Sequence, residues 1–369
     1  MRSSKAMWML VISGLISLAT AHAEDKPTPD ARGPVANPHA PAGYFIAIGG
    51  INTKEPDGHE REAQFGTIHL SRDGETWETV FKGGSVTEQF NHANNNLLRC
   101  LAYGNGVFVV VGNAKNILVS RDARKWELAD APHGAFSVDF GNGRFVAPTA
   151  SDILVSTDGV KWTRHEPKLS TPVWGKDGAG HVRKTVFGNG VFVCIGEQRV
   201  SVTKDGETWL HHELIPEDKR AGQFSLAFGP SSVTPRAADE AAAKRFVWLR
   251  EKQPHLRSVD GIKWETINYP DANTGKPSFE GLWTGTHFLV RGKDCFYESP
   301  DAIAWTKREC KGYGHPAAVG GDLMLGANWP AGFRLSSDQG KTWKQIKTDI
   351  AARRVYFFDG KQIVGQNGG

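Results

Sequence analysis

The chain has few cysteines and no long apolar run, and both scarcities limit what it can be. Its 369 residues include four cysteines, no two of which form a CxxC pair, and the apolar run at residues 7–19 is too short to span a membrane. The patterns GxxxxGK(S/T), HExxH and GxSxG are missing. Nothing therefore indicates a P-loop enzyme, a zinc protease or a serine esterase, and we expect no metal site and no cofactor.

Charge of one sign is also lacking. The sequence has 44 basic and 40 acidic residues, and removing Arg2 and Lys5 with a leader leaves 44 − 2 = 42 basic against 40 acidic. No run of lysine and arginine occurs, so the chain offers no general attraction for nucleic acid or anionic membranes. We expect a monomer that selects its ligand through a local site.

The first residues are typical of export. Arg2 and Lys5 precede the apolar run, and Ala21 and Ala23 form a small-x-small cleavage site, so residues 1–23 are predicted to be a secretory signal peptide. Residues 24–42 are rich in proline and alanine and predict an extended linker. The folded part should cover residues 43–369 of a periplasmic or secreted protein.

One short turn is repeated seven times in that part. The first copy is SRDGETW, residues 71–77, in which aspartate can accept backbone hydrogen bonds and glycine can supply a positive φ. The copies end in tryptophans 36 (Trp126 to Trp162) to 55 (Trp209 to Trp264) residues apart, the length of a four-stranded propeller blade. The repeated aspartates are Asp73, Asp122, Asp158, Asp205, Asp260, Asp301 and Asp338.

A second repeated unit lies upstream of each turn. It consists of a β-rich run, a Gly/Asn reversal and another β-rich run, as in LAYGNGVFVVVG at residues 101–112, and predicts a hairpin. The first copy, from residue 43, lacks its first strand, whereas residues 354–360 near the end supply a spare one. We therefore predict an all-β, seven-bladed β-propeller of four-stranded blades, in which the C-terminal strand completes the first blade and closes the ring.

The seven turns resemble the Asp-box, or BNR repeat, of the sialidase superfamily, Ser-x-Asp-x-Gly-x-Thr-Trp. The last copy matches it in full through Ser336, Asp338, Gly340, Thr342 and Trp343, and the other copies drop one residue between aspartate and tryptophan. The resemblance covers about residues 44–365 and implies a propeller. Because such turns occur in sialidases, lyases, assembly factors and binding proteins, it implies no single activity.

Propeller ligands usually bind at the mouth of the central channel. The position five residues before the end of each first strand holds Arg99, Phe136, Arg183, Phe224, Glu280, His315 and Arg354. Ring closure would bring Arg99, Arg183 and Arg354 around one axis, where guanidinium groups match carboxylate or sulfate oxygens. The alternative is that these strand ends are simply solvated.

The sequence leaves two function classes open. The leading hypothesis is a module that binds an anionic ligand, such as a carboxylated or sulfated carbohydrate. The alternative is a carbohydrate-active enzyme, with a polysaccharide lyase favoured over a sialidase-type hydrolase and with Glu280, Tyr313 and His315 as candidate catalytic residues.

Four further residues complete the candidates. Trp174 and Trp329 lie in segments on the predicted ligand face and could stack on sugars or pin their own loops. Residues 50–66 should form a long loop on the same face. Cys295 and Cys310 flank one turn symmetrically and predict a disulfide, whereas Cys100 and Cys194 should be buried free thiols.

Overall fold

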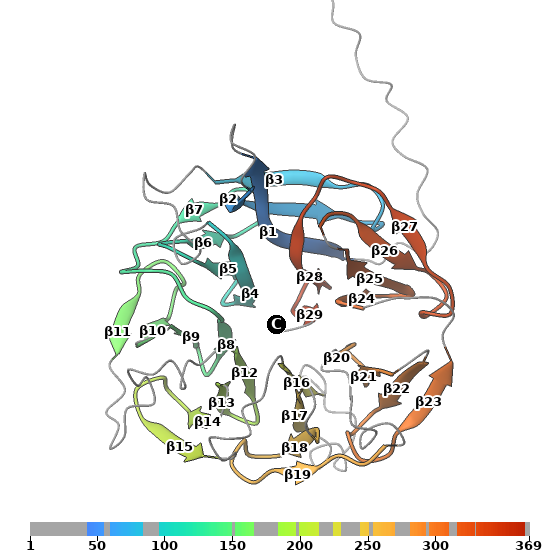
Figure 1. Cartoon of the computed structure of the whole chain (residues 1–369). Helices are drawn as coiled ribbons and strands as arrows, with labels where there is room; N and C mark the ends of the chain where they lie inside the picture. The colour runs from blue at the N-terminus through green and yellow to red at the C-terminus, as the bar shows by residue number, and fades with distance from the viewer. Residues whose placement is uncertain are drawn as a thin grey trace, which may run out of the picture. The chain divides into compact units, whose positions relative to one another are not determined.

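Short antiparallel strands follow one another along the chain and form seven sheets arranged around a central axis (Figure 1). The computed structural model describes residues 43–54, 60–83, 96–149, 152–165, 184–196, 199–213, 224–229, 244–250, 254–269, 281–292, 295–309, 316–328 and 330–365. The predicted signal peptide and linker lie outside these residues. The predicted seven-bladed β-propeller is confirmed.

Six blades are built from four consecutive strands, the first innermost and the fourth outermost. Blade 2 comprises β4 (Leu98–Gly104), β5 (Val107–Gly112), β6 (Ile117–Ser120) and β7 (Glu127–Leu128). Blade 3 comprises β8 (Asp139–Gly141), β9 (Arg144–Pro148), β10 (Ile153–Ser156) and β11 (Thr163–His165). Blade 4 comprises β12 (Lys184–Gly188), β13 (Val191–Ile195), β14 (Arg199–Thr203) and β15 (Trp209–Glu213). Blades 5 to 7 comprise β16 (Phe224–Gly229), β17 (Arg245–Arg250), β18 (Leu256–Ser258) and β19 (Glu265–Thr266); β20 (Gly281–Trp283), β21 (Phe288–Arg291), β22 (Cys295–Ser299) and β23 (Thr306–Glu309); and β24 (Ala318–Gly320), β25 (Leu323–Ala327), β26 (Phe333–Ser336) and β27 (Lys344–Ile346).

Blade 1 joins the two ends of the folded part. Its strands run in the order β29 (Ile363–Gly365), β28 (Ala352–Phe358), β1 (Tyr44–Lys54), β2 (Glu60–Ser71) and β3 (Glu78–Lys82). Tyr44 pairs with Phe358, so β28 serves as the missing first strand, as predicted. A hairpin at residues 356–365 was expected from the repeat, but its second strand, β29, adds a fifth strand to the blade; it lies inside β28, next to β24 and β20.

The prediction of a long loop at residues 50–66 is wrong for residues 50–54 and 60–66, which belong to β1 and β2. The backbone of β1 stays paired with β2 from Gly50 opposite Gly66 to Lys54 opposite Glu60, with one irregularity after Ile51. The glycines and charged residues that suggested a loop are therefore carried by two long strands. Residues 55–59, between them, lie outside the described residues.

Close contacts between aromatic rings and glycines form the seams between blades. The glycine that ends an inner strand faces an aromatic side chain of the next blade, and a Cβ on Gly104 or Gly188 would lie 2.0 Å from Phe140 or 2.3 Å from Phe228. Only glycine leaves room for such an approach. The repeated pairing of an inner-strand aromatic with a glycine is thus a packing device that sets the distance between blades.

The connections define two faces of the propeller. One side carries the turns between first and second strands and the seven Asp-containing turns. We call this side the turn face. The opposite side, with the connections from second to third strands and from one blade to the next, is the loop face. Most segments outside the described residues are connections of the loop face.

Candidate functional site

The seven Asp turns are held by similar hydrogen bonds to the aspartate. In the first, the Oδ1 atom of Asp73 accepts hydrogen bonds from the backbone N–H groups of Glu75 and Thr76 at 2.8 and 2.7 Å and from the Ser71 hydroxyl at 3.1 Å. The Trp77 indole donates to the Gly74 carbonyl at 3.2 Å. The other six aspartates also accept hydrogen bonds from backbone N–H groups of their own turns: Asp122, Asp158, Asp205, Asp260, Asp301 and Asp338.

These bonds favour the ionised carboxylates. Backbone N–H groups of Lys125 and Arg124 hold the pKa of Asp122 below its usual value. At Asp338 burial acts in the opposite direction, but hydrogen bonds from the hydroxyl and backbone of Thr342 outweigh it and bring the pKa to about 2. The Oδ1 atom of each of these two carboxylates is engaged within its own turn, which indicates a structural role.

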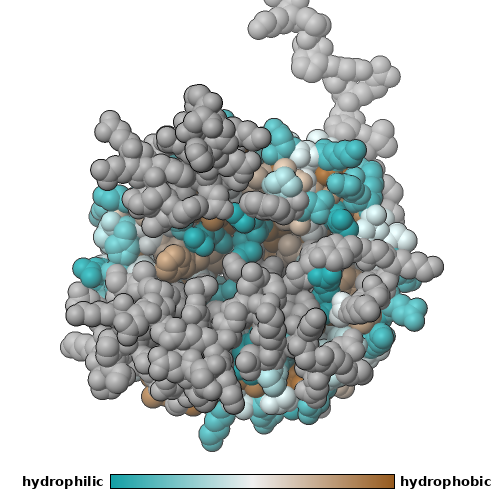
Figure 2. All heavy atoms as spheres, viewed as in Figure 1, coloured by the Kyte–Doolittle hydropathy of each residue, from teal (hydrophilic) through white to brown (hydrophobic). Residues whose placement is uncertain are grey.

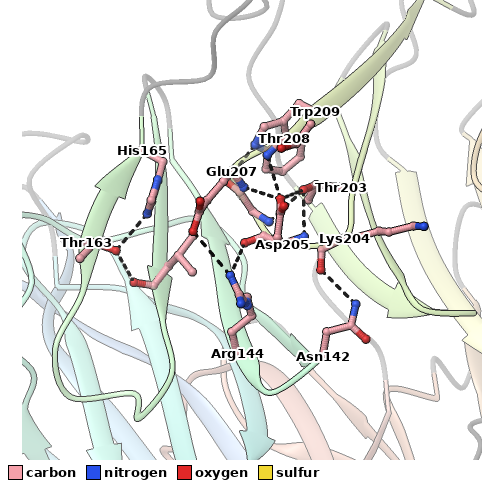
Figure 3. Close-up of polar contacts among 12 residues, drawn as sticks. Asn142, Arg144, Thr163, His165, Thr203, Lys204, Asp205, Glu207, Thr208 and Trp209 are labelled. Carbon is pink, nitrogen blue, oxygen red and sulfur yellow. Dashed lines mark hydrogen bonds and ion pairs between the residues drawn. The ribbon is translucent and has the colours of Figure 1, made fainter.

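The Asp turns also join neighbouring blades. The Asn142 side chain, from the inner turn of blade 3, donates to the carbonyl oxygens of Gly190 and Lys204 in blade 4 at 2.9 and 3.0 Å. Arg144 donates to the Asp205 carbonyl at 3.1 Å and lies 3.6 Å from the Glu207 carboxylate (Figure 3). The Asp turn therefore stabilises the contact between neighbouring blades as well as the hairpin of its own blade.

Two of the predicted ligand-binding arginines lie on adjacent inner strands. Arg354 is on β28 and Arg99 is on β4, and these strands contact each other across the seam between blades 1 and 2. The seam is held by the Leu101 backbone N–H, which donates to the Tyr356 hydroxyl at 3.2 Å. Ring closure thus places two arginines that are far apart in sequence on neighbouring strands.

Arg354 is a partly buried cation with unused hydrogen-bonding capacity. Its Nη1 donates to the Arg353 carbonyl at 2.9 Å, but its buried Nε has no hydrogen-bond partner in the part of the chain that the structure describes. Burial lowers the pKa of Arg354, and the positive charge of Arg353 lowers it further. An anion close to this guanidinium would relieve both effects.

Arg99 is oriented by its surroundings. Its Nε donates to the Asn113 side-chain oxygen, and its guanidinium carbon lies 5.4 Å from the centre of the Phe136 ring. Phe136 occupies in blade 3 the position that Arg99 occupies in blade 2. Two of the positions aligned from the sequence are therefore neighbours in the structure, and the Arg99 side chain is fixed by an aromatic contact.

The other predicted ligand-binding and catalytic residues, Arg183, Glu280, Tyr313, His315, Trp174 and Trp329, lie outside the described residues. The strand register of blade 6 can be compared with the sequence alignment that selected Glu280 as a candidate residue. Trp283 pairs with Phe288 and faces Gly229, as Phe228 faces Gly188, so Trp283 corresponds to Tyr103 of blade 2. Counting back four residues as from Tyr103 to Arg99 gives residue 279, one residue before Glu280.

Two of the three described cysteines match expectation. Cys100 and Cys194 are free and fully buried. Cys295 is also buried, and its partner across the β22–β23 pair is Glu309. Cys310 follows Glu309 and lies outside the described residues, so the disulfide stays a prediction.

A cavity at the turn-face end of the channel was missed by the sequence analysis. Its volume is about 640 Å³, and its walls are the ends of inner strands, the turns that follow them and β29. One of its lining residues is Asp139, and burial raises the pKa of the Asp139 carboxyl to about 7. The only sequence signal was an aspartate in the segment VDFG, at a position where the neighbouring copies have the apolar residues Ala102 and Val186.

A buried polar cluster in blade 5 was missed as well. His255 is fully buried, its Nδ1 is hydrogen-bonded to the Tyr269 hydroxyl at 2.5 Å, and burial lowers its pKa to about 4. The nearby Arg250 donates to the Pro254 carbonyl and is 6% exposed. Because these side chains are closed to solvent, we interpret the cluster as support for the second-to-third-strand connection of the blade.

The centre of the propeller carries both polar and apolar side chains. In the space-filling view, hydrophilic side chains of described residues gather beside hydrophobic ones near the middle of the molecule (Figure 2). Such a mixed surface is typical of binding sites that combine apolar walls with a few polar groups. No helix of the described residues is long and apolar enough to cross a membrane.

Comparisons with known proteins support the fold. No protein-family model matches the chain, and no curated protein matches its sequence. Among solved structures, apo AztD from Citrobacter koseri has a TM-score of 0.51 at 9% identity, covering 88% of this chain and 99% of that one. YCF48 from Cyanidioschyzon merolae has a TM-score of 0.43 at 15% identity, covering 82% of this chain and 98% of that one. The Cps50 (Swd1) β-propeller domain from Myceliophteria thermophila has a TM-score of 0.46 at 8% identity, covering 79% of this chain and 97% of that one. Both are more distant in shape than AztD. Identities this low carry no conclusion about activity.

Proposed function

We propose that this protein is an exported propeller that binds an anionic ligand, a carbohydrate carrying carboxylate or sulfate groups, at the loop-face mouth of its channel. The observation that carries the proposal is the partly buried guanidinium of Arg354, whose Nε has no acceptor among the described residues. A bidentate carboxylate or sulfate would supply one. Arg99, on the adjacent inner strand, adds a second positive charge next to an aromatic ring.

The carbohydrate part of the proposal rests on the sequence. Trp174 and Trp329 belong to loop-face connections, and tryptophan rings pack well on sugar faces. Export rests on residues 1–23, and the assignment to the Asp-box propellers rests on the seven turns and their shared hydrogen bonds. Fractionation of expressing cells and N-terminal sequencing would test export: a mature chain beginning at Glu24 outside the cytoplasm is expected, and an uncleaved cytoplasmic chain would contradict it.

The binding test uses purified protein and three classes of acidic oligosaccharide: uronate-containing, sulfated and sialylated. Isothermal titration at low and high salt should show binding of at least one class that weakens with salt, since the contact is ionic. Arg354→Gln and Arg99→Gln should each weaken it by about ten- to a hundredfold, as expected for a charged hydrogen bond worth roughly 1.5 to 3 kcal/mol. Arg121→Gln is the matched control, because Arg121 is exposed on the turn face.

The outcomes separate the alternatives. Binding that is equal in wild type, Arg354→Gln and Arg99→Gln would overturn the arginine site, provided that circular dichroism shows all three folded. Absorbance of unsaturated products during the incubation would instead favour the lyase alternative, with Tyr313 and His315 as the first residues to substitute.

A further inference from the structure

The cavity at the turn-face end of the channel has the dimensions of a small-molecule site. Pockets for such ligands have volumes of about 300 to 1,000 Å³, and this cavity has about 640 Å³. On one side it is bounded by Gln362, Ile363 and Val364, which belong to β29 and the turn before it. The fifth strand of blade 1 thus supplies a wall that a four-stranded blade would lack.

Half-buried aromatic rings from consecutive blades line this cavity: Tyr103, Phe140, Phe187 and Phe228. One side of each ring packs within its own blade, for example Phe140 on Phe145 at 4.8 Å between ring centres. Because the rings remain partly exposed, they offer apolar surface to whatever occupies the cavity. Such surface favours an apolar ring in a ligand.

Among the described residues that line the cavity, Asp139 is the one carboxylate. Its Oδ1 and Oδ2 atoms accept hydrogen bonds from the backbone N–H groups of Phe140 and Phe187 at 2.8 and 2.7 Å. Among the residues that the structure describes, no lysine, arginine or histidine forms an ion pair with it. Each carboxylate oxygen has further lone pairs, so Asp139 can accept another hydrogen bond from a ligand.

The other ionisable groups that the structure describes around Asp139 form no ion pair with it. The thiols of Cys100 on β4 and Cys194 on β13 interact with it electrostatically, and burial raises the pKa of both thiols, so they are neutral from pH 6 to 8. Tyr103 and Lys244 also line the cavity, but neither forms a hydrogen bond or an ion pair with Asp139. A partly buried carboxylate without a paired cation is unfavourable, and a cation that entered the cavity would stabilise it.

We propose that the turn-face cavity is a second binding site, for a small molecule that carries an aromatic or similar apolar ring and a cationic amine. The ring contacts the aromatic walls, and the amine pairs with the Asp139 carboxylate. This site is separate from the anion site proposed at the loop face, because its lining comes from the opposite ends of the inner strands. The two ends of one channel would then select ligands of opposite charge.

The test compares two probes of the same shape on the full mature chain. Phenethylamine is a cation at neutral pH, as alkyl amines are, whereas 2-phenylethanol is its neutral counterpart. The Asp139 carboxyl has a pKa of about 7, so its ionised fraction rises about tenfold from pH 6 to pH 8. Phenethylamine should therefore bind about tenfold more tightly at pH 8, and 2-phenylethanol equally at both values.

Two further measurements keep the proposal falsifiable. Titration of wild type at pH 7 in buffers of different ionisation enthalpy should show release of about half a proton per phenethylamine and none with 2-phenylethanol. Asp139→Asn should remove the pH dependence and the preference for the amine, while Glu207→Gln, which removes an exposed carboxylate of the turn face, should change neither. If wild type binds the two probes equally at pH 8, or binds phenethylamine without proton release, the proposal fails.

Discussion

The Asn142 side chain, in the inner turn of blade 3, lies 3.0 Å from the carbonyl oxygen of Lys204, 62 residues further along the chain in the Asp turn of blade 4. A second hydrogen bond reaches the Gly190 carbonyl at 2.9 Å. The residue has a φ of 47°, which asparagine tolerates better than most residues. One side chain thus connects two turns of the next blade.

Asn142→Gly should lower the free energy of unfolding by about 1 to 2 kcal/mol, because two interblade hydrogen bonds are lost while the positive φ stays accessible. Urea unfolding followed by tryptophan fluorescence measures the change. Asn105→Gly, which removes a single hydrogen bond to the Thr157 carbonyl, should cost less. Equal stability of Asn142→Gly and wild type would show that these two hydrogen bonds do not stabilise the contact between blades 3 and 4.

Gly261→Ala should be more destabilising than an ordinary Gly-to-Ala change in a turn. Gly261 has a φ of 73° and packs against blade 4, and a Cβ there would lie 2.4 Å from a methyl group of Val193. Strain and overpacking together should cost about 2 to 4 kcal/mol. Gly143→Ala is the matched control, since its φ is 76° but no atom lies within 4 Å of the added methyl.

In the control only the backbone strain of about 1 kcal/mol should appear. Thermal unfolding of the two variants side by side measures the difference. Were the two equally stable, the close approach of the Asp turn to the preceding blade would not limit the residue at this position. Ala123 shows that another blade accommodates a methyl group at the equivalent site, with a φ of 59°.

The architecture could be predicted from the sequence, because each blade repeats two local signals. The Asp turns depend on contacts between residues that are close in sequence, and the Gly-aromatic seam reuses the same positions in successive blades. Closure by β28 followed from the surplus strand at the end of the chain. Local patterns repeated seven times leave few alternatives.

The candidate site was less predictable for a physical reason. The connections of the loop face are not constrained by the repeat, so no pattern indicates how Tyr313 or Trp174 is placed. Asp139 escaped notice because its importance comes from burial next to Phe187 of another blade, 48 residues away. The role of β29 as a fifth strand depends on its contacts with β20 and β24 of other blades, which no single segment reveals.

Acid should destabilise the propeller through its Asp turns. The folded state depresses the pKa of these carboxyls, to about 2 at Asp338. Their contribution is therefore present above the ordinary carboxyl value near 4 and is lost as the pH falls toward 2. Melting temperatures measured from pH 5 to 2.5 should decrease steadily, and Asp338→Asn, which has no carboxyl to protonate at this turn, should decrease less steeply.

Asp139 should act in the opposite direction. Burial raises its pKa from 3.8 to about 7, so the folded state holds this proton more tightly than the unfolded chain. Its effect on stability is favourable below about pH 4 and diminishes as the pH rises to 7. Relative to Asp139→Asn, wild type should lose stability between pH 5 and 8 by at least about 1 kcal/mol, since one pKa unit corresponds to about 1.4 kcal/mol.

Urea unfolding of both proteins at the two pH values measures this difference. If Asp139→Asn shows the same change with pH as wild type, the carboxyl either titrates normally or is ionised throughout. That result would also remove the basis for the pH-dependent binding expected in the turn-face cavity.

The pairing of Tyr44 with Phe358 has a consequence for how the chain acquires its structure. Blades 2 to 7 are made of consecutive strands and can form as each is synthesised, whereas β1, among the earliest to emerge, must wait for β28, one of the last. Contacts between such distant segments form slowly. Until then blades 2 and 7 each present an uncovered side, so the protein is most vulnerable to aggregation and proteases just before its final strands arrive.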